Sequence, residues 1–375
     1  MDWRVKFVDY PEQWRRQREQ LLPIIEDTIA RGDLMLRQQL VDFETNLARF
    51  NGSGHAVGVS NCTDGLRLLA HALDIGEGDE VVSVAHTFIA TISPFVMRGA
   101  TPVFVDIGAD HLMDTDQLLG AITDRTRVII PVHLNGRTVD MAAVQKAADS
   151  VGAVVIEDAA QALGATLGGR TAGTFGWAST YSFYPAKMLG AMGDGGAVLT
   201  DDPALAERLR QLRDHGRVTK SDVDGWGYNC RLDNLQAAIL DWRLSQLPAW
   251  IDRRREVARM YTAMLGDLDR LELPTGPDDD RQRGDVFQNY PVTTDHRDAL
   301  AEHLRNDGVE TLVSWPVPVH RQRGLGLDHW RLPQTERLCQ RVLSLPMHAE
   351  LEDRHVEYVA SSVRRFFSQT ASQKG

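Results

Sequence analysis

Two side chains of opposite charge suggest chemistry in this sequence. Lys187 lies in the apolar and glycine-rich segment 182–196, an unusual setting for a lysine. Burial lowers the pKa of an amine and makes its neutral, nucleophilic form available, so Lys187 could form an imine with a carbonyl compound. Asp158 ends an apolar segment 29 positions earlier, and small residues follow it. Taken alone, each has a simpler interpretation, a solvated surface lysine and an aspartate that caps a helix.

The segments that would position these residues alternate between strand and helix. Short apolar runs predict buried strands, and helical spacing of apolar residues predicts helices at 36–50 and 66–73. This alternation indicates an α/β domain with a largely parallel sheet, whose ligands bind at the carboxyl ends of the strands. Asn61 to Gly65, Asp106, His133 and Asp158 all fall at such ends. The predicted strands are 56–59, 80–84, 101–105, 127–130 and 153–156.

A second, smaller unit is expected towards the C-terminus. After a predicted helix at 235–242, the composition changes to an arginine cluster at 253–255 and a polar run at 275–280. A strand at 287–292 and later helical segments predict an α+β unit. We therefore expect a large domain at 1–248, with an N-terminal helical segment, and a small domain at 249–375.

Charge and composition exclude several classes of protein. The net charge of −11 gives no general attraction to nucleic acid or to an anionic membrane. No apolar stretch is long enough for a membrane span, and the N-terminus lacks a signal-peptide pattern, so a cytoplasmic location is expected. The three cysteines are far apart, which indicates neither disulfides nor a metal site. Segment 190–196 lacks the GxGxxG spacing of a dinucleotide-binding enzyme.

Several motifs, in order along nearly the whole chain, resemble one family of enzymes. Glu-Asp-Ala-Ala-Gln at 157–161, Ser-Phe-Tyr-Pro-Ala-Lys at 182–187 and Gly-Asp-Gly-Gly at 193–196 are similar to fold type I enzymes that use pyridoxal 5′-phosphate (PLP). More narrowly, the sequence resembles the DegT/DnrJ/EryC1/StrS family of sugar aminotransferases. The further matching segments are Gly58–Leu66, His86–Thr91, Pro102–Asp106, Pro131–Leu134, Gly227–Arg231 and Leu343–His348.

The resemblance implies a role for each residue of a PLP site. Lys187 would carry the cofactor as a Schiff base and then act as the base that moves a proton. Asp158 would keep the pyridine nitrogen protonated, Gln161 would donate to the phenolate oxygen, and Phe88 would stack on the ring.

The cofactor phosphate needs donors of its own. The turn at Cys62 and Thr63 opens a predicted helix and offers backbone N–H groups at its positive end, and Ser182 adds a hydroxyl. The resemblance implies that Asn229 reaches the phosphate of the other subunit in a homodimer. A simple turn residue is the alternative for Asn229.

Substrate contacts are also implied by the resemblance. Tyr184, His320 and Arg321 match positions near a nucleotide-sugar diphosphate, and charged donors would be needed there in an acidic protein. The implied reaction transfers an amino group, from glutamate as donor, to a nucleotide-linked keto sugar. Trp315 stands where the family commonly has tyrosine, which leaves the sugar open. The alternatives are a cyclitol aminotransferase and a PLP-binding regulatory protein without turnover.

Overall fold

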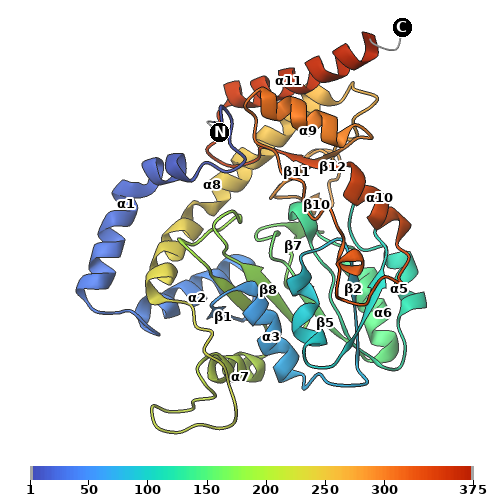
Figure 1. Ribbon diagram of the computed structural model, residues 1–375. Coiled ribbons are helices and arrows are strands. Elements are labelled where there is room, and N and C mark those ends of the chain that lie inside the picture. Colours follow the sequence, from blue (N-terminus) through green and yellow to red (C-terminus); the bar gives the residue numbers. More distant parts are fainter. Residues whose placement is uncertain (1–2, 373–375) are drawn as a thin grey trace.

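A seven-stranded sheet forms the centre of the molecule in the computed structural model, which describes residues 3–372 (Figure 1). All its neighbouring strands pair in parallel except at β9, which runs antiparallel to both of its neighbours. The α/β architecture expected from the sequence is thereby confirmed. In spatial order the strands are β1 (His55–Val59), β9 (Gly196–Thr200), β8 (Ala178–Ser182), β5 (Val154–Asp158), β4 (Thr126–Ile129), β2 (Glu80–Val84) and β3 (Thr101–Val105).

Helices cover both faces of this sheet, which explains why its strands are apolar throughout rather than alternating. Val81 packs in the core on the side of α3 (Cys62–Ala72) and α7 (Pro203–Arg213), whereas its neighbour Val82 packs on the side of α5 (Thr115–Ala121) and α6 (Met141–Val151). Towards β1, the second face is covered by α2 (Gln38–Asn51) and α8 (Asn234–Leu265).

The C-terminal part has its own apolar core above the end of α8 (Figure 1). A two-stranded antiparallel sheet of β11 (Tyr290–Thr293) and β12 (Val342–Leu345) packs with α9 (Arg297–Asn306) and α11 (Asp353–Ser372). The remaining elements are α1 (Tyr10–Ala30), α4 (Ser93–Val96), α10 (Pro333–Arg341), β6 (Thr166–Leu167), β7 (Arg170–Thr171), β10 (Arg283–Gly284) and the 3-10 turns η1 (Ile89–Thr91), η2 (Leu134–Gly136) and η3 (Val319–Arg321).

The predicted division after residue 248 falls inside α8, which continues through Pro248 for 32 residues in all. One helix therefore belongs to both parts, and the division into two domains stays a prediction. In the described part of the chain, no helix combines the length and apolar character needed to cross a membrane. The same residues contain no group of three or more histidine, cysteine or acidic side chains that could bind a metal ion.

Candidate active site

A cavity of about 760 Å³, open to solvent, lies at the carboxyl ends of β5 and β8 and at the first turn of α3. It brings together Lys187 and Asp158, which the sequence predicted as one site. Its lining residues are Asn61, Cys62, Thr63, Asp64, Leu66, Phe88, Ala90, Thr91, Asp158, Ala160, Ser182, Tyr184, Lys187, Asp194 and Trp315.

Lys187 lies on the loop 183–195 between β8 and β9. The side chain borders the cavity, yet its amine is deep enough that burial lowers its pKa from the ordinary 10.5, an effect that the charge of Asp158 opposes. Helix α8 holds this loop: Gln236 bonds both the N–H and the carbonyl of Met192, at 2.8 and 3.0 Å, and Arg243 donates to the Gly190 carbonyl. The amine is thus presented by a loop that is fixed after the lysine.

Asp158 is the last residue of β5, and its side chain is buried. One carboxylate oxygen accepts a hydrogen bond from the Thr91 hydroxyl at 2.7 Å, and the other accepts from the Ala160 N–H at 3.2 Å. These bonds leave lone pairs on the carboxylate, which can hold a cationic group in the cavity. The residue does not cap a helix, which was the alternative interpretation of the sequence.

The first turn of α3 forms one end of the cavity. Asn61 caps the helix by accepting the Asp64 N–H at 2.8 Å, and Cys62 and Thr63 are its first two residues, whose N–H groups have no acceptor within a helix. Asp64 would repel an anion, but Arg67 pairs with it at 2.7 Å. Burial raises the pKa of the Cys62 thiol, so Cys62 offers a backbone donor rather than a thiolate. This end of the cavity is suited to an anion.

Glycine is required where β9 begins, directly behind this helix terminus. A Cβ on Gly196 would lie 2.6 Å from the Cys62 nitrogen and 2.5 Å from the Asn61 carbonyl carbon. Any side chain would therefore displace the first turn of α3. Gly196 thus serves the helix-terminus end of the site, whereas Gly190 packs against Pro185 within the loop that carries Lys187.

Phe88 and Gln161 flank the site in different ways. Phe88 lines the cavity with 58% of its surface exposed, as an aromatic ring would be if it covered a flat ligand. Gln161 is not among the lining residues, and its amide oxygen accepts the Asn135 N–H at 2.8 Å. That bond fixes which amide atom faces Asn135 and reserves the NH₂ group as a donor.

Three predicted residues lie away from the cavity of their own subunit. Asn229 is exposed on the segment 214–230. His320 is buried and lies 3.1 Å from a Glu336 oxygen, which also accepts from Arg321 at 2.8 Å. Glu336, in the first turn of α10, therefore binds both side chains that were predicted to bind substrate, the Arg321 guanidinium and the His320 imidazole, whose pKa is lowered by burial. Their substrate role stays a prediction, and it requires Arg321 to exchange this partner.

Thr91, Asp194 and Trp315 also line the cavity; they lie in segments that resemble the family, but no cofactor role was predicted for them. Trp315 has a positive φ of 47°, which is strained for a bulky residue, and its ring packs edge-on against His86 at 5.5 Å. His86 and His133 do not line the cavity; His133 is fully buried against Glu157 at 2.7 Å. The signals for Thr91 were its place in the matched segment His86–Thr91 and its position three residues after Phe88.

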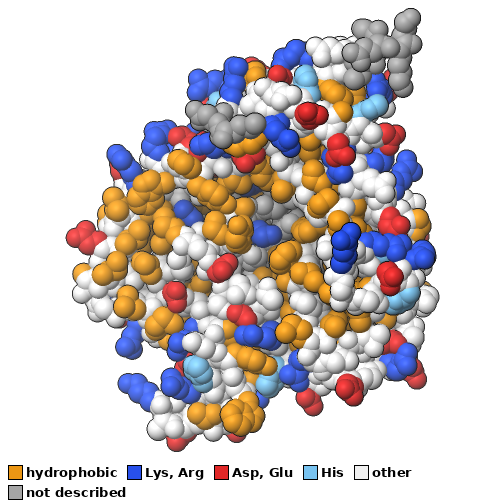
Figure 2. Space-filling view, viewed as in Figure 1, with side chains coloured by type: hydrophobic (Ala, Val, Ile, Leu, Met, Phe, Trp, Pro, Cys, Tyr) orange, Lys and Arg blue, Asp and Glu red, His pale blue; other side chains and the backbone are white. Residues whose placement is uncertain are grey.

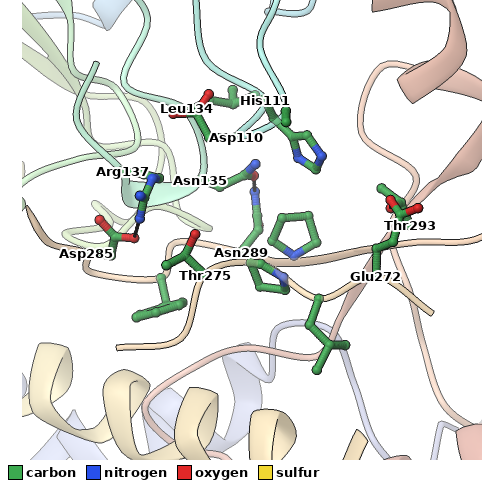
Figure 3. A pocket seen from close by; sticks show the side chains of 15 residues that line it. Asp110, His111, Leu134, Asn135, Arg137, Glu272, Thr275, Asp285, Asn289 and Thr293 are labelled. Atoms are coloured by element: carbon green, nitrogen blue, oxygen red, sulfur yellow. Dashed lines mark hydrogen bonds and ion pairs between the residues drawn. The ribbon is translucent and has the colours of Figure 1, made fainter. Parts of the chain in front are cut away.

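A second cavity lies between the sheet and the C-terminal part (Figure 3). Figure 3 shows its polar groups bonded to one another: Arg137 pairs with Asp285 at 2.6 Å, and Asn289 donates to Asn135 at 3.0 Å. Neither Lys187 nor Asp158 reaches it. None of the residues that line it lines the first cavity, and Asn135 donates its N–H to Gln161, beside the first site.

The first cavity fits one cofactor. A buried amine that can form an imine, a carboxylate for a protonated ring nitrogen, and a helix terminus for a phosphate match the three functional groups of PLP. The α/β fold and this cavity define a PLP-dependent enzyme of fold type I.

Comparisons with known proteins identify the family. The model of the DegT/DnrJ/EryC1/StrS aminotransferase family matches residues 16–364. A dTDP-3-amino-3,4,6-trideoxy-alpha-D-glucose transaminase of Micromonospora megalomicea is 42% identical, over 93% of this chain and 96% of its own. A protein of Geobacillus stearothermophilus named pleiotropic regulatory protein is 37% identical, over 97% and 98%.

A solved structure agrees with these sequence relatives. The crystal structure of Streptomyces venezuelae DesV in complex with a ketimine intermediate has a TM-score of 0.93 and 39% identity, and the match covers 97% of this chain and 98% of that one. The chain belongs to the DegT/DnrJ/EryC1/StrS aminotransferase family. It is a PLP-dependent aminotransferase, as the resemblance implied.

Proposed function

We propose that this enzyme transfers an amino group from glutamate to a keto sugar carried on a nucleoside diphosphate, as a step in amino-sugar biosynthesis. The observation that carries the proposal is the cavity in which Lys187 and Asp158 meet the first turn of α3. The name of the 42% identical relative, a dTDP-sugar transaminase, supports the substrate class.

Each residue of the cavity would have a distinct task. PLP supplies an electron sink that stabilises negative charge on the carbon next to the amine. The Lys187 amine would hold the cofactor, and once released it would take a proton from the substrate carbon and return it to the cofactor. Asp158 would keep a proton on the ring nitrogen, and Gln161 would donate its NH₂ group to the phenolate oxygen. The N–H groups of Cys62 and Thr63, with Ser182, would bind the phosphate.

The active unit in this proposal is a homodimer in which Asn229 contacts the phosphate of the other subunit. Trp226, three residues earlier, has 90% of its surface exposed, an unusual position for tryptophan in an isolated subunit. Figure 2 shows hydrophobic side chains gathered on the side where α1 lies, and α1 exposes Tyr10, Trp14, Leu22 and Ile29. Both surfaces are suited to burial by a second copy of the chain. We place this dimer in the cytoplasm.

Tyr184 is the predicted substrate residue with the most direct support. It lines the cavity and exposes 53% of its surface, so its hydroxyl is available to a ligand larger than the cofactor. Arg321 and His320 would contribute to the diphosphate site if substrate displaced Glu336. The exposed face of Trp315 would contact the sugar.

The second candidate is a PLP-binding regulatory protein, because one relative has a regulatory name. Nothing in the cavity favours a cyclitol over a nucleotide sugar. We favour turnover because the 42% identical relative is named a transaminase.

The test separates the two halves of the reaction. The purified protein should be yellow, glutamate should bleach the visible band in a single turnover, and a nucleotide-linked keto sugar should restore it. A keto-cyclitol is measured alongside. Faster return of the band with the uncharged ring would overturn the nucleotide-sugar proposal, and a band that glutamate leaves unchanged would favour the regulatory candidate.

A further inference from the structure

A short chain of hydroxyl groups leads to the Asp158 carboxylate. The hydroxyl oxygens of Thr87 and Thr91 are 2.8 Å apart, and the Thr91 oxygen is 2.7 Å from the Asp158 Oδ2 atom. Since an ionised carboxylate can only accept, Thr91 must donate to Asp158, and its oxygen then accepts from Thr87. The direction of both bonds is therefore fixed, from Thr87 to Thr91 to Asp158.

The side chains of Thr87, Thr91 and Asp158 are all buried, with at most 6% of their surface exposed. A hydrogen bond to a charged group is stronger in such surroundings, and a donor that itself accepts a bond is polarised further. Thr91 also lines the cavity, so it lies at the boundary between the carboxylate and a bound ligand. It is one of two groups that hold the carboxylate, and Ala160 is the other.

The same segment also carries Phe88, whose ring lines the cavity. Phe88 lies between Thr87 and Thr91, directly before the turn η1, and η1 is closed by the Thr91 N–H bonding the Phe88 carbonyl at 3.0 Å. One five-residue segment thus sets the orientation of Asp158 from the side and presents Phe88 to the cavity. A ligand ring that pairs with Asp158 at its edge and stacks on Phe88 at its face would be oriented by this one segment.

We propose that Thr91 is a positioning residue for the reaction: its hydroxyl, polarised by Thr87, holds the Asp158 carboxylate in the orientation that pairs with the cofactor ring nitrogen. The inference rests on the role of Asp158 in the proposed function. Loss of the hydroxyl leaves the carboxylate held by the Ala160 N–H alone and less restricted in rotation, so the ring is bound at a less defined tilt.

The experiment compares Thr91→Val, which keeps the shape and loses the hydroxyl, with Thr91→Ser, which keeps the hydroxyl. Thr200→Val is the matched control. The Thr200 hydroxyl is also buried, donates to the Trp177 carbonyl and accepts from the Asp202 N–H, but it lies at the end of β9 that is away from the cavity. Measurements are the rate of the glutamate half-reaction at saturating cofactor, the circular dichroism of the bound cofactor band, and the Tm of the cofactor-free protein.

We expect Thr91→Val to slow the half-reaction roughly tenfold to a hundredfold, the range for loss of one hydrogen bond to a charged group. The dichroic band should weaken, Thr91→Ser should remain within about threefold of wild type, and Thr87→Val should give a smaller loss. Thr200→Val should lower Tm without changing the dichroic band.

Three results would overturn the inference: a Thr91→Val rate within threefold of wild type, an equal loss in Thr91→Ser, or an equal loss of rate and dichroism in Thr200→Val. Asp158→Asn separates this inference from the proposed function. If that variant keeps the wild-type rate and band, the role of Asp158 itself is wrong. If it is inactive while Thr91→Val is normal, only the role of Thr91 is wrong.

Discussion

Burial lowers the pKa of the Lys187 amine below the ordinary value of 10.5, and the Asp158 carboxylate in the same cavity offsets only part of this shift. The amine is therefore neutral over a wider pH range than that of an ordinary lysine. A neutral amine is the form that attacks an aldehyde.

The first prediction is that Lys187 alone captures the cofactor. Borohydride reduction of the loaded protein followed by peptide mapping should place the label on Lys187, and Lys187→Ala should stay folded without a visible band. In the cofactor-free protein, acylation of Lys187 should titrate with a midpoint below 10.5. Label on Lys6, Lys146, Lys220 or Lys374 would contradict the assignment.

The second prediction concerns shared sites. Lys187→Ala and Asn229→Ala should each be inactive as pure dimers, because each lacks one component of both sites. After subunit exchange, each mixed dimer contains one site in which both residues are intact. About half of the sites in the mixed dimers should therefore be active. Exchange is verified by mass-tagged subunits. Proven exchange without recovered activity would falsify the trans contact.

The third prediction tests the diphosphate site. Arg321→Gln should raise the KM of the nucleotide sugar roughly tenfold to a hundredfold, because one charged hydrogen bond to a phosphate is lost, while the glutamate half-reaction keeps its rate. Glu336→Gln is the matched variant, since it releases both Arg321 and His320 from their present partner. It should leave this KM unchanged or lower it. An increase in KM with Glu336→Gln alone would show that Glu336 orders the substrate site instead.

The fourth prediction is a pH dependence of stability. Burial lowers the pKa of His86 from 6.5 to about 3. Between these values the unfolded chain binds a proton at this residue that the folded chain does not, so stability falls as the pH falls, by up to about 1.4 kcal/mol per pH unit. In cofactor-free protein, His86→Gln should therefore show a shallower loss of Tm between pH 6.5 and 4. Parallel curves for the two proteins would contradict this.

Much of the sheet could be predicted because its strands are buried on both faces. Strands β2 and β3 have the bounds that their apolar runs indicated. Strand β9 was missed because it follows the glycines after Lys187 directly, and its antiparallel direction depends on pairing with β1 and β8. An N-terminal helical segment was predicted, but the bounds of α1 were not, because only Gln17, Leu21 and Thr28 along its 21 residues are buried.

The site was predictable to the extent that residues act from the end of a strand or helix. Asp158 ends β5 and Cys62 begins α3, whereas Lys187, which lies in the loop after β8, was indicated by its apolar and glycine-rich surroundings; all three line the cavity. The partners of His320 and Arg321 could not be foreseen, because Glu336 meets them through the path of a loop rather than through any periodic pattern. Thr91 was hidden for a similar reason: its bond to Asp158 joins residues 67 positions apart.

Helix α8, with its 32 residues at a rise of 1.5 Å each, is about 48 Å long and contacts both parts of the molecule. Near one end, Gln236 and Arg243 bind the loop that carries Lys187; further along, Arg254 donates to the carbonyls of Phe287, Gln288 and Met347 at 2.9–3.2 Å. The loop that carries Lys187 and the C-terminal part are therefore bonded to the same helix, on either side of Pro248.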